Sequence, residues 1–185
     1  PRFAGVVWTP GNHDLWSRDG GPRGEERYER LLEVCRSCDV VSPEDPYPVC
    51  EAGGEELVLA PVFCLYDYSF RKPGLSKAEA LELARETSAF CADERLLHPD
   101  PHPSREAWCH ERVRITERRL ADAAASGRRL VLVSHFPLRR DTVRLPAIPY
   151  FSPWCGTALT EDWHLRFNAA SVVSGHLHVP GTLWR

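Results

Sequence analysis

Three apolar runs, far apart in the chain, each end in a short turn that carries amide, imidazole or carboxylate groups. The runs and the turns that follow them are residues 3–8 with Gly11–Asp14, residues 130–133 with His135, and residues 171–174 with Gly175–His178. Uninterrupted apolar runs are typical of buried strands, and Pro10 and Gly11 break the first into a tight turn. In α/β folds, ligands bind at the carboxyl ends of strands. We therefore expect the three turns to form one site.

The segments between these runs predict helices and one further strand. Apolar residues from Tyr28 to Cys35 repeat at helical spacing, and Ser76 with Glu79 forms a capping box. In chain order we expect a helix over about residues 25–37, a buried strand over 57–64, a helix over about 76–90, a loop over 93–103 and a helix over about 104–126. Pro61 is unusual within a paired strand. Strands that alternate with helices favour an α/β fold.

The polar residues of the three turns are suited to binding a metal ion. Asn12 offers an amide oxygen, and His135, His176 and His178 offer imidazole nitrogens, which suit Zn²⁺, Mn²⁺ and Fe²⁺. His176 and His178 would share a face on extended backbone, whereas on a loop they could diverge towards two adjacent ions. Gly175 would permit the close approach that a crowded site needs. A single histidine after a strand is more often structural, but three such turns together favour a metal centre.

The other two residues of the first turn suggest catalytic roles. His13 follows a predicted ligand and would face the substrate rather than the metal. Asp14 could accept the Nδ1 proton of His13 and hold its tautomer. His13 would then serve as a general acid or as a donor to phosphoryl oxygen, a contribution of roughly 10²- to 10⁴-fold in rate.

In this order and at these strand ends, the turns resemble the late motifs of the calcineurin-like metallophosphoesterase superfamily: G-N-H-[DE], a strand-end H and G-H-x-H. The resemblance implies an incomplete four-layer αββα sandwich, with two packed sheets flanked by helices, and the length of 185 residues favours a single domain over residues 1–185. It implies two divalent metal ions (Mn, Fe or Zn) and attack of a metal-bound hydroxide on a phosphoester. Asn12, His135 and His176 would bind one ion, and His178 would bind the other. His13 would assist the leaving group.

The early motifs of the superfamily, D-x-H and G-D-x-x-D, do not precede Asn12. Asp100-Pro101-His102 and Asp162-Trp163-His164 match D-x-H literally, but the first lies in a proline-rich loop and no apolar run introduces the second. Because the chain begins at Pro1 and contains no Met, we expect a domain truncated at both ends. Such a segment would expose a sheet edge or apolar surface, hold at most one metal ion weakly and lack activity alone.

The stretches between the motifs resemble an actinobacterial branch of the superfamily. They are Asp45–Val49, Leu65–Phe70, Leu97–Pro101 and Trp154–Thr157. This resemblance implies hydrolysis of the phosphoester that joins 4′-phosphopantetheine to an acyl carrier protein. Arg71, Arg139 and Arg140 could contact the acidic carrier protein near the site, or they could form a solvated basic surface.

The composition limits which partners the protein can bind and in which compartment it is expected. A net charge of −3, from 23 basic and 26 acidic residues, gives no general attraction to nucleic acid or to anionic lipid. No apolar run approaches the ~18 residues of a membrane-spanning helix. Seven cysteines is an odd number, and Cys64 and Cys109 occupy apolar positions. We interpret them as free thiols in a reducing compartment, which predicts a cytoplasmic protein.

Two other functions are compatible with the sequence. One is a catalytically inactive binding or scaffolding protein that keeps the metallophosphoesterase fold. The absence of the early motifs favours this alternative, and the complete late motifs oppose it. The other is a mononuclear zinc-binding protein built from His135, His176 and His178.

Overall fold

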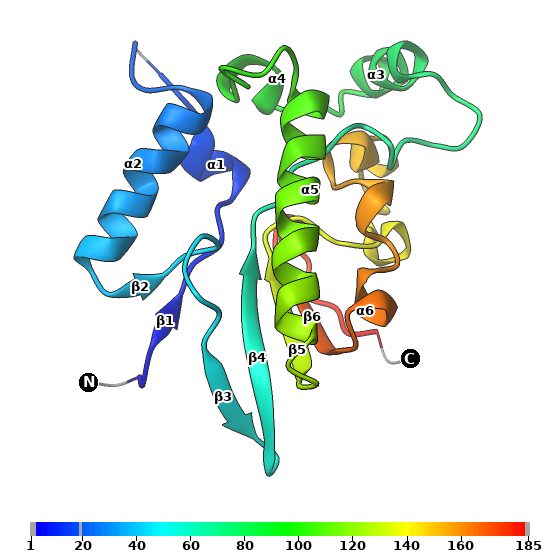
Figure 1. The fold of residues 1–185 in the computed structure, drawn as a ribbon. Helices are drawn as coiled ribbons and strands as arrows, with labels where there is room; N and C mark the ends of the chain where they lie inside the picture. Colours follow the sequence, from blue (N-terminus) through cyan, green and yellow to red (C-terminus); the bar gives the residue numbers. More distant parts are fainter. Residues whose placement is uncertain (1–2, 19, 184–185) are drawn as a thin grey trace.

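The structure is a computed structural model that describes residues 3–18 and 20–183 (Figure 1). The ends of the predicted domain, residues 1 and 185, lie outside the described residues. The elements in chain order are β1 (Val6–Val7), α1 (Asn12–Leu15), α2 (Gly24–Ser37), β2 (Val40–Val41), β3 (Val49–Ala52), β4 (Glu55–Val62), α3 (Lys77–Glu86), α4 (Asp93–Leu96), α5 (Arg105–Ala124), β5 (Arg129–Ser134), three 3₁₀ turns η1 (Arg140–Thr142), η2 (Pro149–Trp154) and η3 (Ala158–Thr160), α6 (Trp163–Arg166) and β6 (Ala169–Ser174). Strands and helices are mixed along the chain, which confirms the predicted α/β class.

The larger sheet has four strands in the order β3-β4-β5-β6. Strands β4, β5 and β6 are parallel and end level, because Val62 pairs with Ser134 and Ser134 pairs with Ser174. Strand β3 is antiparallel to β4, and β1 and β2 form a separate parallel pair. The residues that follow the three parallel strands therefore emerge at one edge of the sheet, which was predicted for the turns after β5 and β6, whereas β1 lies in the separate pair.

Pro61 lies within β4 without breaking the sheet. The Leu59 N–H donates to the Pro48 carbonyl, on the β3 side of the strand. The Pro61 nitrogen, two residues on, faces the same side, but the pairing of β3 with β4 ends at Val58. The N–H that proline lacks would therefore have had no strand partner, which explains why proline is tolerated there.

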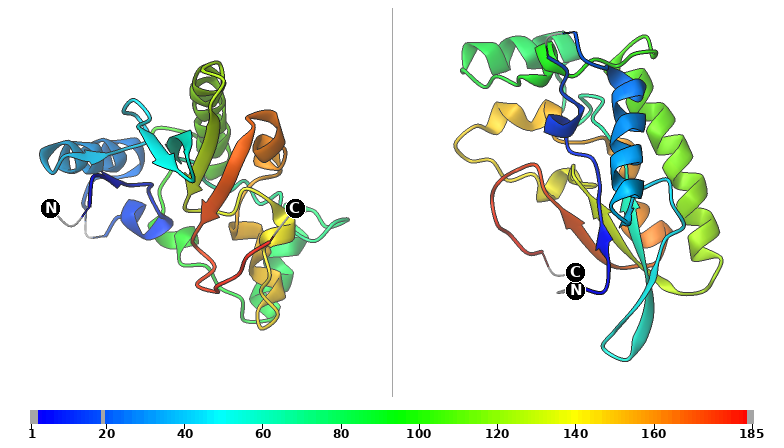
Figure 2. Two further views of the ribbon diagram at one scale, coloured as in Figure 1. Left: turned by 90° about the horizontal axis from the view of Figure 1, so that it is seen from below. Right: turned by 90° about the vertical axis from the view of Figure 1, so that its left-hand side faces the viewer.

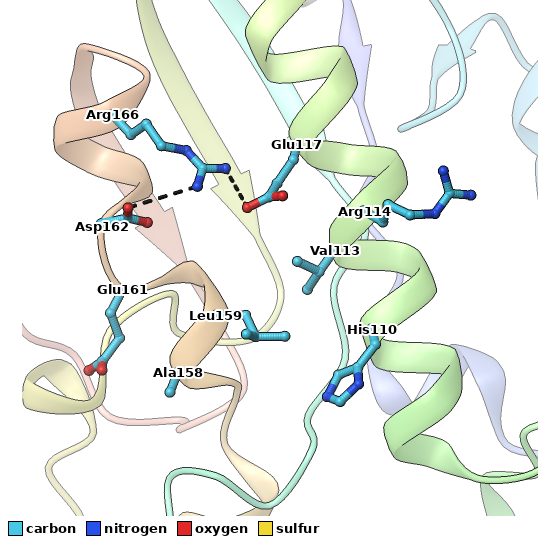
Figure 3. A pocket seen from close by; sticks show the side chains of 9 residues that line it. All are labelled: His110, Val113, Arg114, Glu117, Ala158, Leu159, Glu161, Asp162 and Arg166. Atoms are coloured by element: carbon cyan, nitrogen blue, oxygen red, sulfur yellow. Dashed lines mark hydrogen bonds and ion pairs between the residues drawn. The ribbon is translucent and has the colours of Figure 1, made fainter.

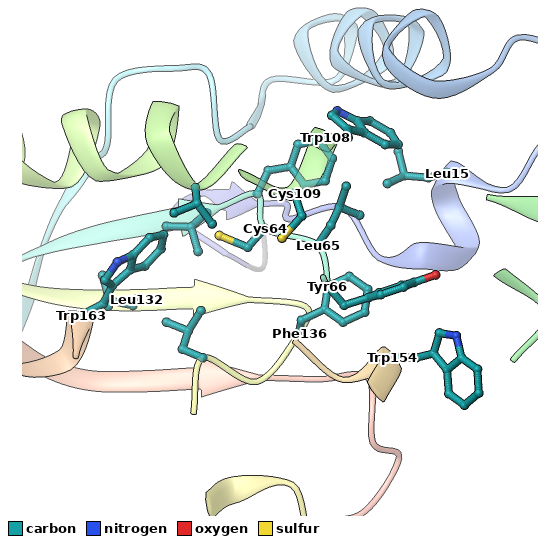
Figure 4. Close-up of a cluster of buried hydrophobic side chains, with 14 of the residues drawn as sticks. Leu15, Cys64, Leu65, Tyr66, Trp108, Cys109, Leu132, Phe136, Trp154 and Trp163 are labelled. Carbon is teal, nitrogen blue, oxygen red and sulfur yellow. The ribbon is translucent and has the colours of Figure 1, made fainter. Parts of the chain in front are cut away.

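Aromatic residues from the helices and the strand ends form the core. Helix α5 packs against β4 and β5 and runs along the sheet, and α6 packs against β6 (Figures 1 and 2). Trp108 of α5 and Trp163 of α6 are fully buried, and Trp108 meets Phe63 edge-on with ring centroids 5.7 Å apart (Figure 4). Edge-to-face contact is a favoured geometry for aromatic pairs. All seven cysteines are free, and Cys64 and Cys109 are buried in this core, as predicted.

The last strand of the larger sheet exposes apolar side chains. Strand β6 is an edge strand, and Val173 on it is 51% exposed. Exposed apolar surface at a sheet edge was expected from the sequence. In the part of the chain that the structure describes, no helix combines the length and the apolarity that crossing a bilayer requires.

Three predicted elements differ from the structure. The strand predicted over residues 3–8 is only two residues long, because its partner β2 is equally short. The loop predicted over 93–103 begins with the helix α4, to whose Leu96 carbonyl the Ser17 N–H donates at 2.9 Å. The helix predicted to reach residue 90 ends at Glu86. The prolines that suggested a loop all lie beyond Leu96, so they do not oppose α4.

Replacement of Gly24 should destabilise the fold. Gly24 begins α2 with φ at +52°, and an added Cβ would lie 1.9 Å from the carbonyl oxygen of Asp100. Gly24→Ala combines a left-handed backbone cost of about 1–2 kcal/mol with an overlap costing roughly 1–3 kcal/mol. Urea denaturation should therefore show a loss of roughly 2–5 kcal/mol in the free energy of unfolding. Gly127→Ala is the control, since Gly127 also has positive φ but faces open space. Equal losses in the two variants would contradict this account.

Candidate metal centre

Asn12, His135 and His176 converge at the edge where the parallel strands end, and we call these three residues the donor cluster. Oδ1 of Asn12 lies 2.9 Å from Nε2 of His135, and the same nitrogen lies 3.2 Å from Nδ1 of His176. Asn12 begins α1, His135 directly follows β5, and His176 lies just beyond β6. Three of the four predicted metal ligands are thus brought together.

Hydrogen bonds between the turns fix their relative positions. The Thr9 hydroxyl donates to the Val62 carbonyl at 2.5 Å, which joins the turn after β1 to the end of β4. The Gly175 N–H donates to the His135 carbonyl at 2.9 Å, which joins the turns after β5 and β6. The backbone therefore contributes to the geometry of the donor cluster, and the side chains do not determine it alone.

Gly11, rather than Gly175, provides the close approach that the site needs. A Cβ added to Gly11 would lie 2.8 Å from Nδ1 of His135, well inside van der Waals contact. A Cβ added to Gly175 would come no closer than 3.6 Å to any atom outside its chain neighbours, which is an ordinary contact. The prediction that Gly175 makes room for the site is therefore wrong. The imidazole of His135 instead lies against the bare Cα of Gly11.

Burial lowers the pKa of both imidazoles in the donor cluster. The pKa of His135 falls to about 4 and that of His176 to about 3, and burial is the largest cause for each. The charge of Asp14 acts in the opposite direction on His135, while the neighbouring His178 lowers both values further. Both rings are therefore neutral at pH 7, the form in which histidine binds metal ions.

The donor cluster has the chemistry and spacing of a metal site. One imidazole proton on His135 Nε2 cannot satisfy both of its close contacts, whereas a divalent cation would satisfy the lone pairs of all three donor atoms. Metal–ligand bonds of about 2.0–2.2 Å place adjacent donor atoms roughly 2.8–3.6 Å apart, and the observed separations are 2.9 and 3.2 Å. Among the described residues, no group of three or more His, Cys, Asp or Glu is placed to hold a metal ion. The Asn12 amide is therefore essential to the set.

His178 does not join the donor cluster. Its side chain is exposed, and both His176 and His178 have positive φ, +66° and +54°. This left-handed backbone is uncommon outside glycine, although histidine adopts it more often than most residues. Of the two arrangements that the sequence left open, the structure has the loop. The role of His178 as a ligand of a second ion stays a prediction.

His13 and Asp14 lie beside the donor cluster. The predicted hydrogen bond between them does not form. His13 is exposed, and its ring packs on Trp16 with centroids 3.9 Å apart. Asp14 accepts a hydrogen bond from the Gly11 N–H at 2.9 Å, which satisfies the backbone donor at the start of α1. Asp14 therefore shapes the turn rather than orienting the imidazole of His13. An exposed His13 next to Asn12 still suits contact with a substrate, and its catalytic role stays a prediction.

The three arginines predicted to contact substrate form hydrogen bonds or ion pairs with other groups of the chain. Arg71 donates to the Leu75 carbonyl at 2.7 Å, and Arg140 donates to the Ser69 carbonyl at 2.6 Å. Arg139 forms an ion pair at 2.7 Å with the aspartate two residues on. These contacts hold the loop between β4 and α3 and the segment after β5 in place, so a role in substrate binding stays a prediction.

The sequence did not predict Asp93 as a part of the site. This fully buried residue of α4 accepts a hydrogen bond from the Asn12 side chain across 81 residues. No motif spacing marks it, because its partner lies so far away in the chain. An acidic residue at the start of a helix is also common for local electrostatic reasons.

An open groove of about 500 Å³ lies elsewhere, between α5 and the η3–α6 segment (Figure 3). Arg166 forms ion pairs there with both Glu117 and Asp162. No predicted site residue lines this groove. Its charged groups largely neutralise one another, and the donor cluster is the better candidate for chemistry.

The chain belongs to the calcineurin-like phosphoesterase family, whose sequence profile matches residues 1–180. Members of this family use divalent metal ions. The family predicted from the three turns is thereby confirmed.

One curated relative is the [acyl-carrier-protein] phosphodiesterase PptH of Mycobacterium tuberculosis. The chain is 47% identical to it over 187 residues, covering 99% of this chain and 57% of the relative. The crystal structure of phosphopantetheinyl hydrolase (PptH) from the same organism superposes with a TM-score of 0.92 at 46% identity, covering 99% of this chain and 66% of that one. The chain thus spans somewhat less than two thirds of the length of these relatives.

Replacement of Gly11 should weaken metal binding. Gly11→Ala forces the imidazole of His135 away from the turn, because the new methyl group would overlap the ring. In the full-length protein we expect the dissociation constant for Mn²⁺, measured by calorimetry, to rise on the order of tenfold or more. Gly175→Ala is the matched control and should leave Mn²⁺ affinity nearly unchanged. Equal effects of the two substitutions would contradict the role given to Gly11.

Proposed function

We propose that the full-length protein is a metal-dependent phosphodiesterase that releases 4′-phosphopantetheine from acyl carrier proteins. The observation that carries the proposal is the convergence of Asn12, which follows β1, with His135 and His176, which follow the level ends of β5 and β6. Similarity to PptH, named as an acyl-carrier-protein phosphodiesterase, supports the choice of substrate.

In this proposal the site holds two divalent ions, Mn, Fe or Zn. Asn12, His135 and His176 bind one ion, and His178 contributes to the other. When bound, such ions act as Lewis acids that activate a water molecule and neutralise charge on the phosphoryl group. The neutral imidazoles of His135 and His176 favour loading at pH 7, because no proton has to leave them first.

The proposed role of His13 is to protonate the leaving group. Hydrolysis adds the water oxygen to phosphorus and breaks the bond from phosphorus to the serine oxygen of the carrier protein, which must then gain a proton. In this proposal the proton comes from His13, and its exposure, its packing on Trp16 and its position next to Asn12 support that role. Asp14 supports this step indirectly by fixing the turn through the Gly11 N–H.

The carrier protein is the proposed macromolecular partner. Arg139 and Arg140 lie in the segment after β5, and Arg71 lies in the loop after β4. The charges of Arg71 and Arg140, which donate to backbone carbonyls rather than to carboxylates, favour an acidic carrier. Seven free thiols suit a reducing cytoplasm, where we place the reaction.

Two substitutions in the full-length protein separate binding from chemistry. His176→Ala should remove bound metal and abolish release of phosphopantetheine, because it deletes a donor atom. His13→Ala should leave metal content nearly unchanged while lowering kcat by roughly 10²- to 10⁴-fold. Metal content is measured by elemental analysis and activity with phosphopantetheinylated carrier protein, beside generic mono- and diesters.

The outcomes distinguish the alternatives. Full activity and metal content in His176→Ala would refute the assignment of the site. A wild-type protein that binds metal and carrier protein without hydrolysing any ester would favour a scaffolding role. One zinc ion per chain without activity would favour a mononuclear zinc protein. Loss of metal in His13→Ala would make His13 a ligand.

A further inference from the structure

We propose that Asp93 of α4 is a positioning residue that fixes which atom of Asn12 faces the metal ion. The inference rests on the proposed function of the donor cluster and goes beyond it. It assigns a role to a residue that belongs to none of the family motifs found in the sequence.

The contacts of Asp93 are buried and directional. Its side chain is fully buried, and its Oδ1 accepts from Nδ2 of Asn12 at 2.8 Å and from the Trp16 indole N–H at 2.6 Å. Asn12 is itself only 4% exposed. The amide of Asn12 thus lies between two partners, with its nitrogen towards Asp93 and its oxygen towards His135.

The hydrogen-bonding chemistry of the Asp93 carboxylate and the Asn12 amide determines how the amide is oriented. A carboxylate only accepts hydrogen bonds, so an amide beside it must present its NH₂ group. The amide oxygen then points the opposite way, towards the imidazoles. If Asp93 were absent, the amide could rotate by 180° and place two N–H donors where a cation needs a lone pair. Groups that orient metal ligands in this way influence affinity strongly.

Hydrogen bonds from neighbouring elements fix the position of helix α4 and therefore of Asp93. Arg105, the first residue of α5, donates to the carbonyls of Asp93, Glu94 and Leu97 at 2.8, 2.9 and 2.9 Å. The Glu94 carboxylate accepts from the Trp154 indole at 2.8 Å. Figure 1 shows α4 at the start of α5, the longest helix drawn. A four-residue helix has little stability alone, so these bonds determine its position.

The experiment compares two substitutions of Asp93 in the full-length protein, with Mn²⁺ as the probe. Asp93→Leu removes the acceptor while keeping similar bulk, and the dissociation constant for Mn²⁺ should rise about 10- to 100-fold. Asp93→Asn keeps an acceptor oxygen for both Asn12 and Trp16, so it should restore affinity close to that of the wild type. Calorimetric titration measures the affinity, and thermal denaturation without metal shows whether each variant is folded.

A third variant separates positioning from packing. Leu97 is fully buried at the end of α4 and makes no polar side-chain contact, so Leu97→Ala should lower the melting temperature without changing Mn²⁺ affinity. The proposal is overturned if Asp93→Leu binds Mn²⁺ as tightly as the wild type. It is also overturned if Asp93→Asn loses as much affinity as Asp93→Leu, or if Leu97→Ala does. A wild-type protein that binds none of Mn²⁺, Fe²⁺ and Zn²⁺ would refute the proposed function itself, and this inference with it.

Discussion

The level ends of β4, β5 and β6 are the constraint on which the whole site depends. Ser134 pairs with Ser174, so His135 and His176 leave the sheet at nearly the same height. A strand advances about 3.3 Å per residue. A register slip of one residue between β5 and β6 would therefore displace one imidazole by as much as the 3.2 Å that separates the two nitrogens. The same slip would turn buried leucines of β5 towards the opposite face. Burial of Leu130 and Leu132 thus protects the site as well as the core.

The first turn depends on long-range contacts more than on its own sequence. Helix α1 has four residues, too few for a stable isolated helix. The bond from Thr9 to the Val62 carbonyl fixes where the turn starts, and Asp93 fixes how Asn12 is oriented. The hydrogen bond from the Gly11 N–H to the Asp14 carboxylate closes the turn on itself. The position of the Asn12 amide is therefore fixed by three features together: the strand ends, the Asp93 carboxylate and the hydrogen bond between Gly11 and Asp14.

The sequence predicted the parts of the structure that local signals determine. Apolar runs located β4, β5 and β6, and Ser76 and Ser104 cap α3 and α5 as their positions suggest. The turns that carry Asn12, His135 and His176 were predicted to form one site, although β1, which precedes Asn12, belongs to a separate two-stranded sheet. What the sequence could not predict is set by residues far apart in the chain. Examples are the helix α4 and the hydrogen bond between Asp93 and Asn12. Another is the close contact with His135 that requires glycine at position 11. Each depends on the folded structure rather than on local sequence.

The separation of the donor atoms along the chain has a thermodynamic consequence. Asn12 and His135 are 123 residues apart, and His135 and His176 are 41 apart, so an unfolded chain holds no preformed portion of the cluster. An ion bound by these residues interacts with the native state alone. It raises the free energy of unfolding by RT ln(1 + [M]/Kd), about 2.7 kcal/mol at a free ion concentration of 100 Kd. In the proposed metal centre the ion therefore also ties together the turns that follow β1, β5 and β6, and the melting temperature of the protein becomes a measure of metal supply.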